Sequence, residues 1–137
     1  PIYNRLLLES HPLFANITLI EGSSTNPETF KQVVAQIQPN QTVLVALDSC
    51  HTHEHVAQEL ALYAPLVTKG SYLVVFDTSV ERFSEKHFKA RPGTKNNNPH
   101  TAVTSFLEMN PEFKADTALE EKLLVTANFN GFLKKIS

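Results

Sequence analysis

The spacing of apolar and polar residues along the chain changes repeatedly, and each change predicts a new element. Continuous apolar runs predict short buried strands at 17–20, 42–47 and 71–76. The last two runs have the composition of parallel strands that are covered on both faces. Apolar residues at helical spacing predict amphipathic helices at 3–10, at 27–37, after Asp48 and at 100–110.

The last quarter of the chain has a different pattern. Residues 112–119 predict an edge strand, and Asn130-Gly131 between two apolar runs predicts a hairpin turn. Strands that alternate with helices pair in parallel through right-handed crossovers. We therefore expect an α/β protein in one domain, 1–137, with an open sheet that finishes in an antiparallel pair.

Composition narrows the classes of partner. The chain has 137 residues, 42% of them hydrophobic, and a net charge of -2 with no basic stripe, so we expect no nucleic-acid partner. No apolar run approaches the roughly 20 residues that span a bilayer, so we expect no membrane partner. Cys50 is the single cysteine. It excludes an internal disulfide and is in keeping with a reducing compartment such as the cytoplasm.

Acidic residues follow the second and third predicted strands directly. Open α/β sheets bind ligands at the carboxyl ends of their strands, and Asp48 and Asp77 stand at two such ends. Paired carboxylates suit a hard divalent cation, Mg²⁺ more than Zn²⁺, because the ligand atoms are oxygens. The alternative is that each acid caps the helix that follows it.

Three histidines at alternate positions, His51, His53 and His55, come next. On a helix His51 and His55 share a face while His53 points away, so a three-histidine zinc site is disfavoured. His51 lies nearest the strand end and is the best candidate for a general base. A solvated first turn of a helix is the preferred interpretation for His53, whereas for His55 it and a functional role are about equally favoured. Cys50 lacks an identifiable third group that would make a cysteine–histidine nucleophile.

The turn after the first predicted strand contains Gly22, Ser23 and Ser24. Its hydroxyls and peptide N–H groups can bind a ligand, or the turn can simply lead into a helix capped by Asn26. The sequence does not favour either of these two interpretations. No glycine-rich phosphate-binding motif is present among the four glycines of the chain.

Four stretches of the chain resemble a known family. Residues 11–28, 43–78, 96–113 and 123–136 are similar to bacterial proteins known as cephalosporin hydroxylases, which are grouped with rhamnosyl O-methyltransferases. The resemblance implies a class I methyltransferase fold that uses S-adenosylmethionine: a Rossmann-like sheet, mostly parallel with an antiparallel C-terminal strand. It implies an O-methyltransferase that acts on a sugar or small natural-product hydroxyl, rather than oxidative chemistry. The alternative is a non-catalytic binding or interaction module with the same fold.

The resemblance also implies that part of the domain lies outside this chain. Family members have a glycine-rich loop after their first strand and a ribose-binding acid after their second, and the chain has neither. Its first predicted strand matches the third strand of the family. We therefore expect the C-terminal part of a catalytic domain, with the N-terminal strands missing and little affinity for cofactor. An exposed sheet edge would invite pairing with another chain, so we expect a homo-oligomer.

Site residues carry over from the family one by one. Gly22, Ser23 and Ser24 match positions that contact the adenine of S-adenosylmethionine. Asp48 and Asp77 match the metal-binding aspartates of metal-dependent O-methyltransferases.

One further position matches a catalytic residue of related enzymes, and two positions differ from the family pattern. His51 stands where catechol-type enzymes have their catalytic lysine. Two positions depart from the pattern, because Thr78 replaces a metal-binding Asn and Phe76 replaces a Glu seen in some members. The resemblance thus implies Mg²⁺ at Asp48 and Asp77, with His51 as the base.

Overall fold

The computed structural model describes residues 4–84 and 93–137. The chain divides into two compact units, residues 1–36 and residues 37–137. Within the described residues no helix is long and apolar enough to cross a membrane.

The first unit is helical. It contains α1 (Arg5–Glu9), the 3₁₀ helix η1 (Pro12–Asn16) and α2 (Pro27–Val34), which confirms the helices predicted at 3–10 and 27–37. At the start of α2 the Asn26 side chain accepts hydrogen bonds from the backbone N–H groups of Glu28 and Thr29. The strand predicted at 17–20 does not form. An apolar run becomes a strand only where a neighbour pairs with its peptide groups, and no described segment does so here.

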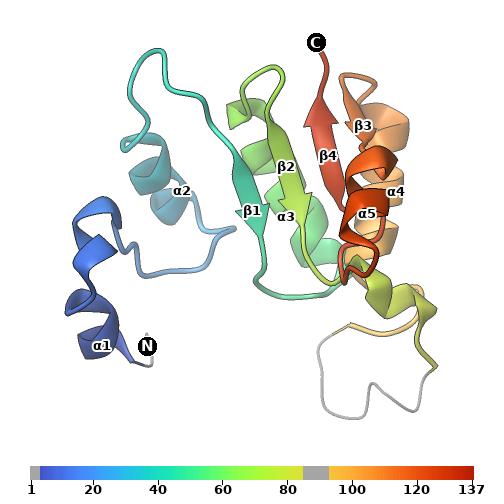
Figure 1. Cartoon of the computed structure of the whole chain (residues 1–137), viewed down its shortest axis with the longest axis horizontal. Coiled ribbons are helices and arrows are strands. Elements are labelled where there is room, and N and C mark those ends of the chain that lie inside the picture. Colours follow the sequence, from blue (N-terminus) through green and yellow to red (C-terminus); the bar gives the residue numbers. More distant parts are fainter. Residues whose placement is uncertain (1–3, 85–92) are drawn as a thin grey trace. The chain divides into compact units, whose positions relative to one another are not determined.

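The second unit is built on a four-stranded sheet. Its strands are β1 (Val45–Leu47), β2 (Tyr72–Val75), β3 (Phe113–Ala115) and β4 (Phe132–Lys135). The order is β1-β2-β4-β3, with β1 parallel to β2, and with β4 antiparallel to both β2 and β3 (Figure 1). Three strands therefore run one way and the C-terminal strand runs the other. This confirms an α/β protein with a mixed sheet and an antiparallel last strand.

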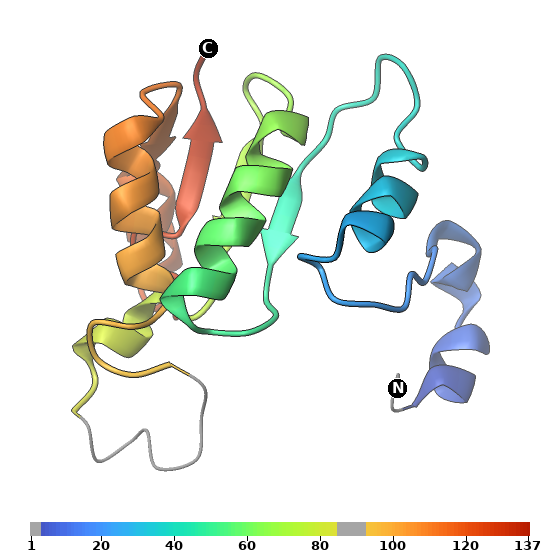
Figure 2. The ribbon, with the colours of Figure 1, turned by 180° about the vertical axis from the view of Figure 1, so that it is seen from behind.

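Helices cover both faces of this sheet. On one face lie α3 (His53–Tyr63) and α4 (Pro99–Met109), side by side (Figure 2). On the other face lies α5 (Thr117–Leu123) (Figure 1). Short 3₁₀ helices, η2 (Ala64–Leu66) and η3 (Thr78–Arg82), follow α3 and β2. The predicted helices after Asp48 and at 100–110 are confirmed.

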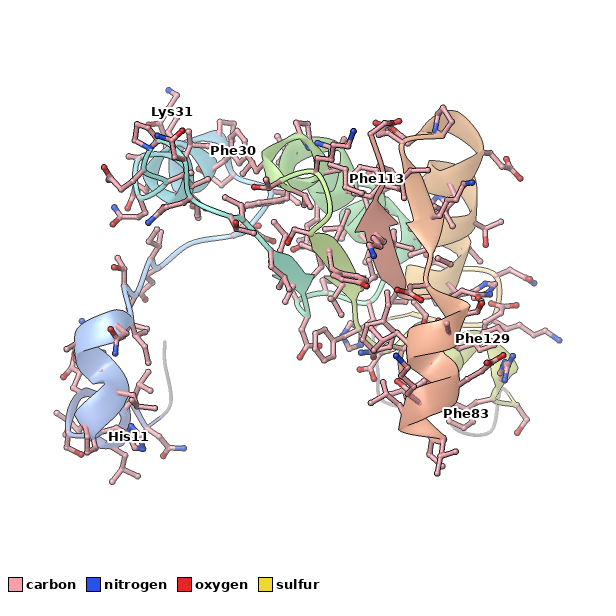
Figure 3. All side chains as sticks on the ribbon, turned by 45° about the horizontal axis from the view of Figure 1, so that its top comes forward. His11, Phe30, Lys31, Phe83, Phe113 and Phe129 are labelled. Atoms are coloured by element: carbon pink, nitrogen blue, oxygen red, sulfur yellow. The ribbon has the colours of Figure 1, made fainter. Side chains whose placement is uncertain are left out.

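Apolar side chains from sheet and helices form one core. Leu73 of β2 is paired in register with Leu133 of β4, and neither is exposed. Phe113 of β3, labelled in Figure 3, packs on Phe106 of α4 with ring centroids 5.4 Å apart. The apolar stripe of α3, formed by Val56, Leu60 and Tyr63, is buried as well.

Of two predictions for the C-terminal quarter, one is confirmed in part and one is wrong. The edge strand expected at 112–119 forms as β3 but stops at Ala115, because the Asp116 side chain accepts a hydrogen bond from the Leu119 N–H and begins α5. Asn130-Gly131 does not form a hairpin turn between two strands. The N–H of Val75 donates to the Gly131 carbonyl, and a Cβ on Gly131 would collide with the Val75 carbonyl oxygen. Gly131 therefore permits a close approach of β4 to β2.

Leu133→Ala tests the centre of this core. Removal of a fully buried leucine side chain leaves a cavity, so we expect the free energy of unfolding to fall by about 2–5 kcal/mol. Urea unfolding measures the change. Leu124→Ala, at a side chain that is 89% exposed, is the control and should change it by less than about 0.5 kcal/mol. Equal losses in the two variants would contradict the position of the core.

Candidate functional site

The parallel pair β1 and β2 brings two acids to one edge of the sheet. Leu47 and Val75 are paired in register at the carboxyl ends of the strands, and the Phe76 N–H donates to the Leu47 carbonyl at 3.0 Å. Asp48 and Asp77 follow directly. Asp48 and Asp77 are therefore close together, as their positions at two strand ends predicted.

His51 lies between these two carboxylates. Its Nε2 is 3.4 Å from Asp48 Oδ1, and its Nδ1 is 3.4 Å from Asp77 Oδ2. One ligand atom from each of the three residues lies within 4.8 Å of the others, so the group can surround a metal ion. We call Asp48, His51 and Asp77 the edge triad.

The edge triad concentrates negative charge and one lone pair. Nε2 of His51 is buried and has no hydrogen-bond partner among the described residues. A neutral imidazole has one N–H group, so it can donate to one carboxylate while its other nitrogen presents a lone pair to the second. Two carboxylates gathered in one place favour a bound cation near them.

The two acids do not act as helix caps. The cap of α3 is Thr52, whose side chain accepts from the His55 N–H, and Asp77 makes no side-chain cap bond to η3. The backbone of Asp77 has a φ of 55°, and its N–H donates to Asn128 Oδ1 at 3.2 Å. Asn128 is buried and was not selected from the sequence. The capping alternative is therefore wrong for Asp48, while Asp77 stands at the N-cap position of η3 but makes no side-chain cap hydrogen bond there.

The other residues of the histidine segment lie outside the edge triad. His53 begins α3, as the helical alternative expected, but it is half-buried and its Nδ1 is 2.8 Å from Thr101 Oγ1 of α4, so its side chain is not fully solvated. His55 Nε2 lies 3.6 Å from Glu59 Oε1. Cys50 Sγ is 3.8 Å from the hydroxyl of Thr52. These contacts give no support to a zinc cage or a thiol nucleophile among the described residues.

A loop that precedes α4 contacts the site from outside. Gly93 has a φ of +95°, and a Cβ there would collide with the carbonyl oxygen of His51. Asn97 Oδ1 accepts from the His53 N–H at 2.8 Å. The loop itself is fixed by the fully buried Asn98, whose side chain donates to Glu81 Oε2 and to the Thr94 carbonyl.

Glu81 is ionised in this arrangement. Partial burial raises the pKa of its carboxyl, but hydrogen bonds from the Asn98 side chain and the Asn96 N–H, with smaller effects of His100 and Lys95, outweigh burial and hold the pKa below the ordinary 4.5. Asn98 also forms a capping box with Thr101 at the start of α4. The asparagine-rich segment Asn96–Asn98 thus makes specific contacts beside the site.

The turn at Gly22, Ser23 and Ser24 belongs to the first unit. A Cβ on Gly22 would collide with the side chain of Thr29, so this glycine lets α2 pack closely on the turn. The hydroxyls of Ser23 and Thr25 are 3.0 Å apart. These contacts are those of a turn that leads into a capped helix. The predicted contact with a cofactor stays a prediction.

Glu59 is a second residue that sequence reasoning missed. It lies on the inner stripe of α3 and is 1% exposed. The signal was present, since a polar residue stands three positions after Val56 and four before Tyr63.

The fold and the edge triad define a class: an open α/β protein with charged side chains gathered where such sheets bind ligands. The chain belongs to the rhamnosyl O-methyltransferase/CmcI family, whose profile matches residues 2–136. This confirms the family resemblance predicted from the sequence.

Curated relatives support the same assignment. Proteins named rhamnosyl O-methyltransferase from Mycobacterium bovis and Mycobacterium tuberculosis are 31% identical over 121 residues, which is 86% of this chain and 46% of theirs. One from Mycobacterium leprae is also 31% identical, over 86% of this chain and 50% of its own. The chain thus spans about half the length of the curated relatives it matches. No solved structure matches it.

Gly93→Ala tests the contact between the loop and His51. Alanine at positive φ is strained by about 1–2 kcal/mol, and the collision with the His51 carbonyl adds about 1–3 kcal/mol. Gly70→Ala is a matched control, since Gly70 has a φ of +84° with open space around it. Urea unfolding and the amide shift of His51 should separate the two variants. A loss for Gly93→Ala no larger than for Gly70→Ala would contradict the contact.

Glu81→Gln tests the charge under the asparagine loop. A carboxyl whose folded-state pKa is lowered stabilises the protein above pH 4.5, and this contribution disappears as the pH falls through the lowered pKa. We expect the Tm of Glu81→Gln to lie roughly 2–5 °C below that of the wild type at pH 7, and the two to converge in acid. Calorimetry over pH 3–7 measures this, with the exposed Glu108→Gln as control. A constant difference at all pH values would contradict it.

Proposed function

We propose that this chain is part of an S-adenosylmethionine-dependent O-methyltransferase that acts on a sugar or small natural-product hydroxyl. The observation that carries the proposal is the edge triad at the carboxyl ends of β1 and β2 in a family named for O-methyl transfer. The relatives' name points to a rhamnosyl group as the acceptor class. We include lipid or natural-product biosynthesis as the setting.

The extent of the enzyme is part of the proposal. We propose that residues 1–137 form the C-terminal part of a class I, Rossmann-like catalytic domain whose N-terminal strands lie outside this chain. Support comes from the coverage, since the curated relatives are about twice as long. The strand order β1-β2-β4-β3, with a reversed last strand, is compatible with that fold. We also propose a homo-oligomer, in which an edge of the sheet pairs with another chain.

The edge triad fits a small divalent cation. Its metal-binding donors are the carboxylates of Asp48 and Asp77, whose oxygens lie close enough together to bind one ion. The lone pair of His51 Nε2 then stays available to accept a proton. Asp48 and Asp77 would bind Mg²⁺, which keeps several waters when proteins supply few ligands. When bound, such a cation lowers the pKa of an alcohol hydroxyl near it.

His51 is the proposed base. The imidazole would accept the proton of the acceptor hydroxyl, while Asp77 would orient the ring through Nδ1 and stabilise its positive charge. Asp48, which is the most exposed of the three, would contact the acceptor side. Nε2 is the nitrogen without a hydrogen-bond partner, so it is the atom that would take the proton.

Gly22, Ser23 and Ser24 are the proposed contacts to the adenine of the methyl donor. S-adenosylmethionine, when bound, supplies a methyl group on a sulfonium sulfur. Gly22 and Ser23 are exposed, so their peptide groups could contact the edge of an adenine ring. Ser24 would complete this contact.

Substitution of the acids tests the proposal in the natural protein that contains these residues. Asp48→Asn and Asp77→Asn should each lower kcat/KM for methyl transfer by about 100-fold or more, because a neutral amide neither binds the cation as well nor balances the imidazolium. His51→Gln should lower kcat by about 10²–10⁴-fold. Glu54→Gln, an exposed site on α3, is the control.

Other outcomes would change the assignment. Full turnover of Asp48→Asn and Asp77→Asn would contradict a role of the edge triad. Calorimetric binding of S-adenosylmethionine without any methyl transfer would favour a non-catalytic binding module. The departures at Phe76 and Thr78 are the observation in favour of that second function.

A further inference from the structure

A buried carboxylate with no place in the proposed chemistry lies on the inner face of α3. The Glu59 side chain is 2% exposed, and its neighbours on the same stripe are Val56, Leu60 and Tyr63. Its Oε1 accepts a hydrogen bond from the Ser49 hydroxyl at 2.7 Å and is 3.6 Å from His55 Nε2. Its Oε2 is buried and has no hydrogen-bond partner among the described residues.

Burial of the Glu59 carboxylate lowers the free energy of unfolding. A buried carboxylate loses its hydration, and an incompletely bonded one recovers little of that loss. Replacement of buried ionic groups by apolar residues of similar volume is often neutral or stabilising. A leucine at position 59 would continue the apolar stripe of α3 without this cost. We therefore expect Glu59 to have a role other than stabilisation of the fold.

The reason lies in what Glu59 binds. Ser49 stands between Asp48 and His51, two members of the edge triad, in a turn without regular structure. Its hydroxyl reaches a residue ten positions later, in the second turn of α3. The far end of the same turn is fixed by Thr52, which caps α3. Residues 48–52, which we call the site turn, are thus bound to α3 at both ends.

We propose that Glu59 is a positioning residue for the edge triad, acting through Ser49. Its carboxylate fixes the Ser49 hydroxyl, which fixes the backbone between Asp48 and His51 and so sets the distance between their side chains. Glu59 itself does not touch the substrate. The use of the site turn in methyl transfer rests on the proposed function, whereas the ordering of the turn by Glu59 does not.

The experiment compares four single variants of this chain and the double variant that combines Glu59→Leu with Ser49→Ala. Glu59→Leu removes the acceptor and keeps the volume, Ser49→Ala removes the donor, and Glu59→Gln keeps a carbonyl acceptor. Glu54→Gln makes the same chemical change at an exposed position of the same helix. Three quantities are measured: Tm, the NMR order parameters of the backbone amides of residues 48–52, and the affinity for Mn²⁺ as a probe of the edge triad.

The positioning role predicts a specific combination of results. Glu59→Leu keeps or raises the Tm, yet lowers the order parameters of the site turn and weakens Mn²⁺ binding by about 3- to 10-fold. Ser49→Ala gives the same loss of order, and the double variant adds nothing further, because both changes break one hydrogen bond. Glu59→Gln lies between these variants and the wild type, and Glu54→Gln has no effect.

Three results would overturn the inference. One is an unchanged site turn in Glu59→Leu. Another is additive losses in the double variant. The third is a lowered Tm with loss of order throughout β1 and β2, which would indicate a structural role. If the wild-type chain binds no Mn²⁺, the proposed metal site fails, while the order parameters still decide the role of Glu59.

Discussion

The register between β1 and β2 is the constraint on which the site depends. Because Leu47 is opposite Val75 in a parallel pair, the acids that follow both strands emerge at one edge of the sheet. A shift by one residue would turn the side chains of one strand to the opposite face and separate Asp48 from Asp77. Leu73 and Val75, both almost fully buried, stabilise this register through the core.

Hydrogen bonds to polar side chains then complete the geometry around that edge. Asn128 fixes the backbone of Asp77, Asn97 contacts the first turn of α3, and Ser49 is bound to Glu59. Each contact joins segments that are distant along the chain or separated by a turn. The edge triad is thus held by the surrounding loops as much as by the strands. Such support is what keeps a ligand site in a fixed shape.

Local signals predicted much of the second unit. The apolar runs at 42–47 and 71–76 predicted β1 and β2, and helical spacing predicted α3 and α4, because burial of one face dominates these segments. The wrong predictions occur where the sequence of a segment is compatible with two different local structures. The run at 17–20 has the composition of a strand but no described partner, and Asp116 turns a predicted strand into a helix.

The sequence by itself determined the family, the alternation of strands and helices, and the placement of Asp48, His51 and Asp77 at strand ends. These follow from local composition and spacing. Only the tertiary structure decided that His51 lies between both carboxylates, that His53 is bound to α4, and that Glu59 is buried against the turn. Those facts depend on contacts across many residues, and such contacts arise only when the helices pack on the sheet.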